Sequence, residues 1–296
     1  MKAKLLLVHA LSPLHAGTGQ GVGILDLPIA REKGTNYPYL PGSSLKGVLR
    51  DACARGEQTK GNTFGLFGPE TNNASDHAGA LVFTDQRLLL FPVRALQGTF
   101  AWVTCPLVLE RFRRDALELE HPETVPAVPI LVSGEHAAVP AGSVLAHEKR
   151  IYLEDLDLKA QAEDPTALEL AKWLGARLFP ASDGSGQAWR GQLLKRLCIV
   201  PDDVFSFLVE TATEINARIR LKPETKTVAD GGLWYEENLP AETVLSGFVA
   251  FLPNEKTAVK EARAWKDLAS LTAAPLQLGG KATVGRGLCS LRFQSQ

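Results

Sequence analysis

Cysteine is scarce in this sequence, neither sign of charge is in excess, and long apolar runs are absent. The 32 lysines and arginines against 33 aspartates and glutamates give a net charge of −1. A polycation is therefore excluded, and any contact with nucleic acid must come from a local patch of cations. No stretch approaches the roughly 20 consecutive apolar residues that span a bilayer, so we expect no membrane contact.

The four cysteines are Cys53, Cys105, Cys198 and Cys289, and none of them forms a C-x-x-C pair. Their wide spacing indicates neither a zinc site nor a disulfide framework. Reduced thiols in a core fit a cytoplasmic protein, which is the localisation that we expect.

The first residues have some features of a signal peptide, because Lys2 and Lys4 precede the apolar residues 5–8. The apolar run is short, His9 interrupts it, and no small-residue cleavage site follows before Ser12. Residues 2–11 are therefore expected to form a buried β-strand.

The chain has 296 residues, 45% of them hydrophobic and 22% charged, which excludes wholesale disorder. Neither an internal repeat nor a dividing linker is evident, so we expect one elaborated domain over residues 1–296. Strands are expected at 2–11, 81–91, 244–251 and 288–293. Helices are expected from Gly42-Ser43-Ser44 onward, at 165–179, from Asp202 or Asp203, and at about 255–271 with Asn254 as its cap. This order predicts an α+β fold with an antiparallel sheet, a ferredoxin-like core with large insertions.

A glycine-rich loop over residues 12–41 carries the first candidate site. Its glycines do not follow the G-x-G-x-x-G register of a dinucleotide site, but they allow close approach to a ligand. His15 and Asp26 bracket the glycines. Together they have the chemistry for RNA cleavage, in which a 2′-hydroxyl loses a proton and a leaving oxygen gains one. Asp26 could instead hold a divalent cation, and the alternative for both residues is simple solvation in a polar loop.

The helix that begins after this loop is a candidate phosphate site. Ser43 and Ser44 lie at its N-terminus, and either of them can cap the helix. Free N–H groups and partial positive charge at a helix N-terminus also favour anions. Lys46 and Arg50 are neighbours on one face of the helix and add full charges. The alternative is a capped helix with a solvated basic face.

Residues 218–237 have the pattern of a basic strand followed by a turn and a returning aromatic strand. Arg218, Arg220 and Lys222 alternate, so an extended strand projects them together. Trp234 and Tyr235 on the returning strand suit base stacking, and the alternative is a half-buried hairpin whose aromatics pack on the core. The adjacent Glu236 and Glu237 are unusual beside a basic strand and indicate acid–base or metal chemistry.

The loop at residues 278–287 lacks the spacing of a P-loop. Its consecutive backbone donors, together with Lys281 and Arg286, nevertheless suit a phosphate backbone. A plain hairpin turn is the alternative.

Residues 12–50, SPLHAGTGQGVGILDLPIAREKGTNYPYLPGSSLKGVLR, resemble the N-terminal signature of the RAMP superfamily. More narrowly, they are similar to the repeated backbone subunit of the type III-B CRISPR (Cmr) RNA-guided effector complex. Matching segments follow at residues 67–68, 78–85, 233–237 and 279–287, so the resemblance extends over nearly the whole chain. One departure is Asp85-Gln86, where superfamily members often have Asp-Ala.

The resemblance implies a modified RRM-like palm with large insertions and an extended β-hairpin thumb at about 216–242. It also implies that copies of the chain stack as a filament along a CRISPR guide RNA. Their thumbs would interrupt the duplex of guide and single-stranded target RNA at regular intervals. The expected partners are these two RNAs, further copies of the chain and the other Cmr effector subunits.

The implied activity is that of a metal-dependent endoribonuclease acting within the assembled complex, by a reaction resembling internal 2′-hydroxyl attack. Asp26 is implied to be required for cutting and His15 to assist it, with Mg²⁺ or Mn²⁺ bound at Asp26 together with the RNA. Tyr235, Glu236 and Glu237 match the functional thumb segment, and which glutamate aligns stays open. The rival functions are a non-catalytic RNA-binding scaffold, with cleavage elsewhere in the complex, and an endonuclease that processes precursor guide RNA alone.

Overall fold

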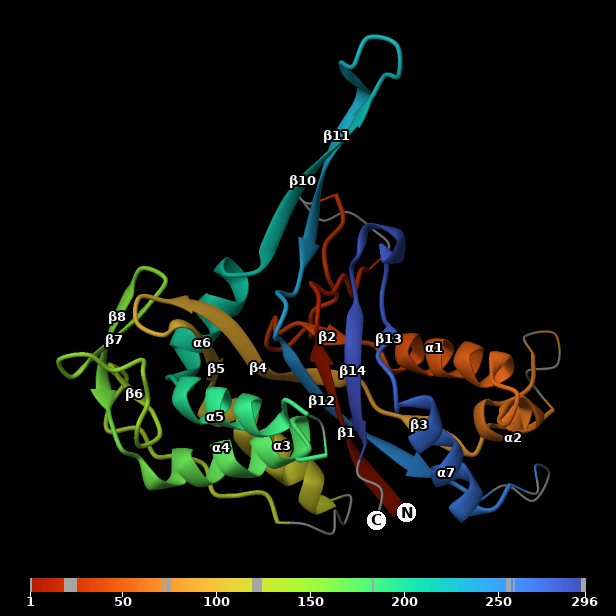
Figure 1. The fold of residues 1–296 in the computed structure, drawn as a ribbon, viewed down its shortest axis with the longest axis horizontal. Helices are drawn as coiled ribbons and strands as arrows, with labels where there is room; N and C mark the ends of the chain where they lie inside the picture. The colour runs from red at the N-terminus through yellow and green to blue at the C-terminus, as the bar shows by residue number, and fades with distance from the viewer. Residues whose placement is uncertain are drawn as a thin grey trace.

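The structure is a computed structural model of the chain and describes residues 2–18, 26–70, 72, 76–118, 124–182, 184–253, 257 and 259–293. A broad body of sheet and helices carries one long projecting hairpin (Figure 1). The strands are β1 Lys2–Ala10, β2 Tyr39–Leu40, β3 Leu81–Phe83, β4 Gln86–Ala95, β5 Thr99–Thr104, β6 His136–Ala138, β7 Arg150–Leu153, β8 Leu156–Gln161, β9 Leu197–Ile199, β10 Glu214–Leu221, β11 Val228–Asn238, β12 Val244–Phe251, β13 Leu276–Gln277 and β14 Leu288–Phe293. The helices are α1 Gly42–Arg55, α2 Thr63–Phe67, α3 Pro106–Glu118, α4 Pro165–Leu178, α5 Gly186–Arg196, α6 Asp202–Thr211 and α7 Glu261–Leu271, with 3-10 turns at Lys60–Asn62 and Ala282–Val284.

The palm is built on four neighbouring strands in the order β14-β1-β12-β4. Strand β1 is antiparallel to both β12 and β14, with Leu5 opposite Phe248 and Val8 opposite Leu291. Helix α1 follows β1 in the chain and α7 lies between β12 and β14. This is the β-α-β-β-α-β connectivity of a ferredoxin-like fold. The expected α+β, RRM-like architecture is therefore confirmed.

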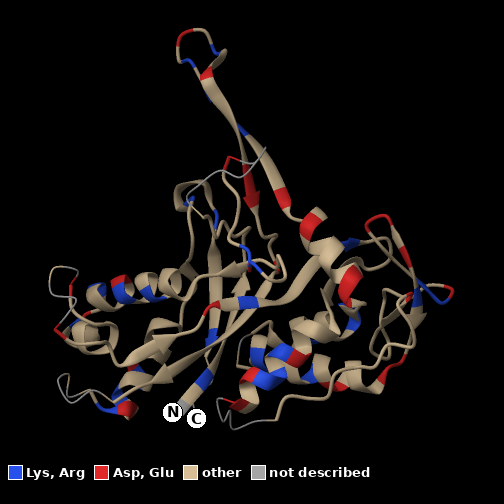
Figure 2. Ribbon diagram, turned by 180° about the vertical axis from the view of Figure 1, so that it is seen from behind, with Lys and Arg blue, Asp and Glu red and all other residues tan. Residues whose placement is uncertain are grey.

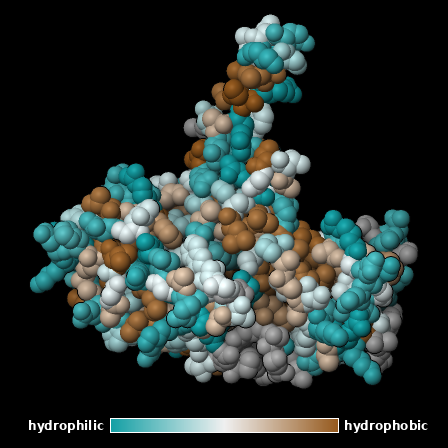
Figure 3. All heavy atoms as spheres, in the orientation of Figure 1, coloured by the Kyte–Doolittle hydropathy of each residue, from teal (hydrophilic) through white to brown (hydrophobic). Residues whose placement is uncertain are grey.

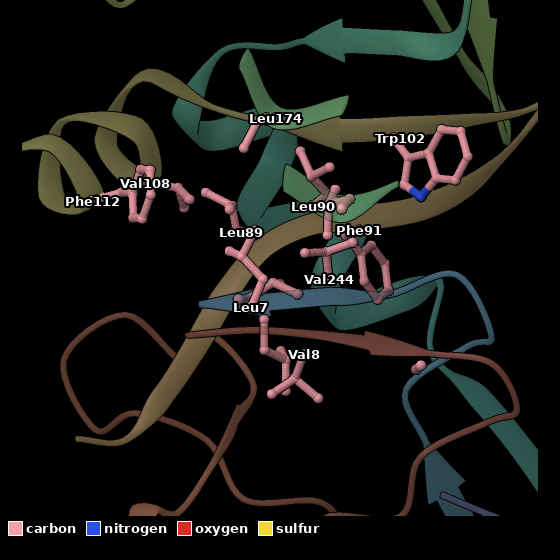
Figure 4. Packing of buried hydrophobic residues seen from close by; sticks show 14 of the residues in the cluster. Leu7, Val8, Leu89, Leu90, Phe91, Trp102, Val108, Phe112, Leu174 and Val244 are labelled. Carbon is pink, nitrogen blue, oxygen red and sulfur yellow. The ribbon is translucent and has the colours of Figure 1, made fainter. Parts of the chain in front are cut away.

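An insertion covers the face of the palm sheet opposite α1. The sheet continues from β4 through β5, β9, β6, β8 and β7, and α3, α4 and α5 lie on that side (Figure 1). In Figure 4, Leu7 lies on the side of β1 that faces Leu89 and Leu174, while Val8 points to the other side. Both side chains are buried. An ordinary RRM stacks bases on its open sheet face, and in this palm that face is covered.

Helix α1 begins at Gly42 as predicted, but neither expected serine caps it. Its N-cap residue is Pro41, which makes no side-chain capping bond. The Gly42 amide instead donates to Asp85 Oδ1 at 2.8 Å. The expectation of a serine cap was wrong because a carboxylate from a distant turn takes that place.

Other differences concern element boundaries. The strand expected at 81–91 is interrupted between Phe83 and Gln86. Helix α7 begins at Glu261, later than expected, and the proposed cap Asn254 lies outside the described residues. Helices α3 and α5 were not anticipated. None of the helices in the described ranges is long and apolar enough to cross a membrane.

Candidate active site

The projecting hairpin, residues 214–238, is the thumb. Strands β10 and β11 are antiparallel, with Ala217 opposite Tyr235 and Arg218 opposite Trp234. Residues directly opposite each other lie on the same face of a two-stranded ribbon. One face therefore carries Arg218, Trp234 and Glu236, and the other carries Tyr235 and Glu237. Charges of both signs are distributed along the thumb (Figure 2).

The far arm of the glycine-rich loop, residues 26–31, joins the free edge of β11. Leu27 donates its amide to the Tyr235 carbonyl at 3.1 Å, and Glu237 donates its amide to the Leu27 carbonyl at 3.0 Å. These two bonds form a parallel bridge between Leu27 and Glu236. The next donor along β11, the Tyr235 amide, bonds to Asp26 Oδ2 at 2.9 Å. The carboxylate thus occupies the position where the next backbone carbonyl of a parallel ladder would accept.

Asp26 is exposed at the point where the arm leaves the thumb. Its other oxygen, Oδ1, carries no hydrogen bond among the described residues. The arm is bonded on its second edge too, because Ala30 donates to the Ala16 carbonyl at 2.7 Å and Thr18 donates to the Pro28 carbonyl at 3.2 Å. The glycines at positions 19, 21 and 23 lie outside the described residues.

His15 also lies at the base of the thumb, where residues 26–31 join β11. Its side chain is buried there, with only 5% of its surface exposed. Its Nδ1 lies 2.8 Å from the Glu237 carbonyl oxygen. Because a carbonyl only accepts, Nδ1 carries the proton of this bond. Two backbone hydrogen bonds between Leu14 and Leu239 hold the segment in place next to this contact.

Glu237 points inward and is 3% exposed. Its Oε1 accepts from Arg31 Nη2 at 2.5 Å and from the Thr213 hydroxyl at 3.1 Å, and its Oε2 accepts from the Ile29 amide at 3.1 Å. Both oxygens are therefore engaged by the chain itself. Arg31 was not a candidate from the sequence, since no local motif marks a contact made 206 positions away.

Glu236 lies on the opposite face of β11 and is 2% exposed. It accepts hydrogen bonds from Trp234 Nε1 at 3.0 Å and Arg218 Nε at 3.2 Å, and Lys281 Nζ lies 3.3 Å away. Burial by itself would raise the pKa of Glu236, but these three partners outweigh it and hold the pKa below its usual value. Glu236 is therefore an anion that ties the thumb to the C-terminal loop.

This arrangement gives several expected RNA-binding residues an intramolecular partner. Arg218, Trp234 and Lys281 converge on Glu236, and Arg286 lies 3.9 Å from Glu214. The positive charge of Arg218, Lys281 and Arg286 is thus partly neutralised within the chain.

The outer thumb keeps more groups exposed. Arg220 is exposed, and Lys222 lies 3.8 Å from the exposed Asp230. On the apolar face Tyr235 is 37% exposed, and Ile219 and Leu233 are exposed too. Apolar atoms gather along the outer thumb in Figure 3. The thumb therefore combines cations with an apolar face, the two features that favour binding of single strands.

A cleft of about 500 Å³ opens at the N-terminus of α1. Its lining comes from α1, the end of α2 and the start of β3: Gly42, Ser43, Lys46, Phe67, Gly68, Pro69, His77, Ala78, Gly79, Leu81, Val82 and Phe83. Ser43 is exposed, whereas Ser44 and Lys46 are half-buried. Arg50 donates to the Gly68 carbonyl at 2.7 Å, so it shapes the wall of the cleft.

The site offers one carboxylate to a cation. Within the described part of the chain, no three His, Cys, Asp or Glu side chains lie together as a metal site. Glu236 and Glu237 are held by cationic side chains, which leaves Asp26. Mg²⁺ is commonly held by one or two carboxylates together with substrate phosphates. Asp26 suits that kind of site, in which RNA supplies further oxygens.

Comparisons with known proteins agree with this architecture. The sequence matches the RAMP superfamily over residues 7–290. It is 37% identical over 300 residues to the CRISPR system Cmr endoribonuclease Cmr4 of Pyrococcus furiosus, covering 99% of this chain and 96% of that protein. The crystal structure of oligomeric Cmr4 from Pyrococcus furiosus aligns over all of both chains with a TM-score of 0.76 and 29% identity.

A chain from the cryo-EM structure of the Type III-B Cmr-beta complex bound to cognate target RNA has the same fold. The TM-score is 0.75 at 20% identity, over 99% of this chain and 97% of that one. The family match and the 37% identity hold for nearly the whole chain. The chain therefore belongs to the RAMP superfamily and, within it, to the Cmr4 family.

Proposed function

We propose that this chain is a guide-RNA-binding filament subunit of a CRISPR effector complex and that it cleaves complementary target RNA endonucleolytically. The observation that carries the proposal is the exposed carboxylate of Asp26, fastened to the base of the thumb by the Tyr235 amide at 2.9 Å. A target strand that passes the thumb meets this carboxylate at a fixed place. The relatives support the proposal, since one is named an endoribonuclease, one is oligomeric and one belongs to a complex with target RNA.

The proposed reaction is attack of an RNA 2′-oxygen on the adjacent phosphorus. The 2′-hydroxyl loses its proton, the bond from O2′ to phosphorus forms, and the bond from phosphorus to O5′ breaks. The leaving O5′ gains a proton, and the products end in a cyclic phosphate and a 5′-hydroxyl. Asp26 is placed to orient the 2′-hydroxyl or accept its proton through Oδ1, because Oδ2 is held by Tyr235.

Asp26 is also the residue that would hold a divalent cation. Mg²⁺ or Mn²⁺ bound there with the RNA would stabilise the negative charge that develops on the phosphate oxygens. The anionic side chain opposes binding of phosphates by itself, so its contribution belongs to the transition state.

The other expected catalytic residues support the site from the interior. His15 is buried and uses Nδ1 on the Glu237 carbonyl, so we propose that it assists by holding the thumb base. Glu236 and Glu237 hold the two faces of β11 against the rest of the chain. Tyr235 differs from these buried residues, because its backbone amide holds Asp26 while its ring remains partly exposed.

For the guide RNA we propose the cleft at α1 as the phosphate-binding surface. Ser43 and Lys46 line it and offer a hydroxyl and an ammonium group to phosphate oxygens, whereas the Gly42 amide at the start of the helix is already bonded to Asp85. The outer thumb, with Arg220 and Lys222, is suited to the single-stranded RNA where guide and target part. Copies of the chain and the other effector subunits would complete the assembly.

The decisive experiment is single-turnover cleavage by the reconstituted complex with Asp26→Ala, at saturating divalent cation and with target-binding titrations. We expect cleavage to be lost while target binding stays nearly intact, since a residue acting in the transition state changes rate and not ground-state affinity. The matched control is Asp230→Ala, which removes an exposed thumb carboxylate near the outer end of β11. His15→Ala should slow cleavage less than Asp26→Ala.

Near-normal cleavage by the Asp26→Ala complex would overturn the catalytic assignment and favour the scaffold function. Processing of free precursor RNA by the isolated chain would instead favour the third function, a guide-processing endonuclease.

A further inference from the structure

We infer that Arg31 is a positioning residue for Asp26, acting through its ion pair with Glu237. The geometry of this inference is independent of catalysis, whereas its effect on rate rests on the proposed function of Asp26. Arg31 lies in the glycine-rich loop but was not among the residues that the sequence singled out for the site. It closes the far end of the same arm that begins with Asp26.

Arg31 joins three parts of the fold. Its Nη2 donates to Glu237 Oε1 at 2.5 Å, and both terminal nitrogens lie 3.2 Å from the Val209 carbonyl of α6. Nη1 also donates to the Asn36 carbonyl at 2.9 Å. The side chain is 17% exposed against 4% for Glu237. One guanidinium thus fastens the glycine-rich loop to the thumb and to the helix that precedes the thumb.

The arm between Arg31 and Asp26 is held by hydrogen bonds along its length. Leu27 is bonded in both directions to β11, the Ile29 amide donates to Glu237 Oε2 at 3.1 Å, and Ala30 is bonded to Ala16. Asp26 lies just beyond the last bridged residue, Leu27. A shift of the arm along β11 is therefore passed directly to the Asp26 carboxylate.

Removing Arg31 acts on this arm in a specific way. Glu237 would remain buried without its cation, and an uncompensated buried carboxylate is strongly unfavourable. Water or rearrangement must then satisfy Glu237, which also holds the Ile29 amide of the arm. The arm loosens on β11, and the Tyr235 amide loses its fixed acceptor.

The expected kinetic effect is on the chemical step. A misplacement of about 1 Å far from the chemistry can cost about 10²-fold in rate. We expect Arg31→Met to lower the single-turnover rate roughly 10- to 100-fold with unchanged target affinity, because Arg31 is directed into the fold. Arg31→Lys should recover part of the rate, since it keeps the charge toward Glu237 without the second contact to Val209.

A matched control lies nearby. Arg111 makes a bidentate pair with Glu32, next to Arg31 in the chain, at 2.7 and 2.8 Å, and the two side chains are 22% and 18% exposed. This pair is as firmly built as that of Arg31, yet none of the partners of Arg111 among the described residues lies on β11. Arg111→Met should therefore cost comparable thermal stability while leaving the cleavage rate close to that of the unaltered complex.

The test combines single-turnover cleavage with amide hydrogen exchange of the reconstituted complex. Arg31→Met should speed exchange in the peptides containing residues 26–31 and Tyr235, and Arg111→Met should not. Unaltered exchange and rate in Arg31→Met would overturn the inference, as would equal rate losses in both variants. If Asp26→Ala cleaves normally while Arg31→Met still releases these amides, the proposed function fails and the positioning geometry stands.

Discussion

The backbone amide of Tyr235 donates a hydrogen bond to the carboxylate of Asp26, joining residues 209 positions apart in the chain. The bond extends the bridge between Leu27 and Glu236, so one side chain continues a backbone ladder. A carboxylate held in this way moves with the thumb. The orientation of the thumb therefore sets the orientation of the group that we propose for cleavage.

Lys46 and Arg50 of α1 are expected to behave differently in RNA binding. On single strands, the log–log salt slope is about −0.7 for each neutralised phosphate. Lys46 lines the cleft, so Lys46→Ala should flatten the slope by about one phosphate equivalent. Arg50 is committed to the Gly68 carbonyl, so Arg50→Ala should mainly lower thermal stability, by about 1.5–3 kcal/mol. Binding titrations over a salt series test both, and an unchanged slope for Lys46→Ala would remove α1 from the binding surface.

The ion cluster at Glu236 should make the attachment of the thumb sensitive to acid. The pKa of Glu236 is lowered in the folded chain, so its stabilising contribution is complete above the unfolded value of about 4.3 and is lost as the pH falls through the folded pKa. Glu236→Gln should be less stable than the unaltered chain at pH 7, and the difference should shrink below about pH 4. Denaturant unfolding at several pH values measures this. Glu224→Gln, on the exposed turn of the thumb, is the control, and a Glu236→Gln deficit that is as large at pH 3 as at pH 7 would contradict the assignment.

Alanine substitutions of two glycines in the C-terminal loop should distinguish the cost of backbone strain from the cost of a steric clash. Gly279 and Gly285 have positive φ values of 70° and 79°, so alanine at either costs roughly 1–2 kcal/mol. A Cβ at Gly279 would also lie 2.3 Å from the His15 carbonyl oxygen, whereas one at Gly285 meets nothing within 4 Å. Gly279→Ala should therefore lose about 1–3 kcal/mol more than Gly285→Ala and should disturb the cleavage site. Equal unfolding free energies for the two variants would argue against the contact of this loop with His15.

Assembly on RNA should proceed stepwise. We expect head-to-tail contacts, which do not close, to add copies of the chain as the guide lengthens. The cleft at α1 and the outer thumb are separate surfaces, so one chain can contact successive stretches of one strand. Sedimentation with guide RNAs of increasing length should show successively larger particles. A dimer of fixed size at every length would contradict this prediction.

Much of the fold follows from local patterns in the sequence. The apolar run of β1 and the helical spacing of Leu45 and Leu49 mark elements that the structure buries. The basic strand and the returning aromatic strand over 218–237 likewise form the hairpin β10–β11, although its turn lies at residues 222–227 and not at Gly231. These features depend on near neighbours in the chain, and short-range periodicity is enough to predict them.

The composition of the candidate site was also visible in the sequence, because Asp26, His15 and residues 235–237 stand out by type. The partners of these residues in the folded chain could not be read from the sequence. Alternation along a strand places Glu236 and Glu237 on opposite faces, yet it says nothing about what covers each face. The structure pairs Glu236 with Arg218 and Lys281, and pairs Glu237 with Arg31.

The sequence by itself thus determined the main elements of the palm, their order and the residue types available for chemistry. Only the tertiary structure decided that Asp26 bonds to β11, that Asp85 takes the place of a serine cap on α1, and that Arg31 belongs to the site. The physical reason is the separation along the chain over which each kind of interaction acts. Helix and strand periodicity is set by neighbouring residues, whereas these hydrogen bonds join segments that meet only when the palm sheet has brought distant parts of the chain together.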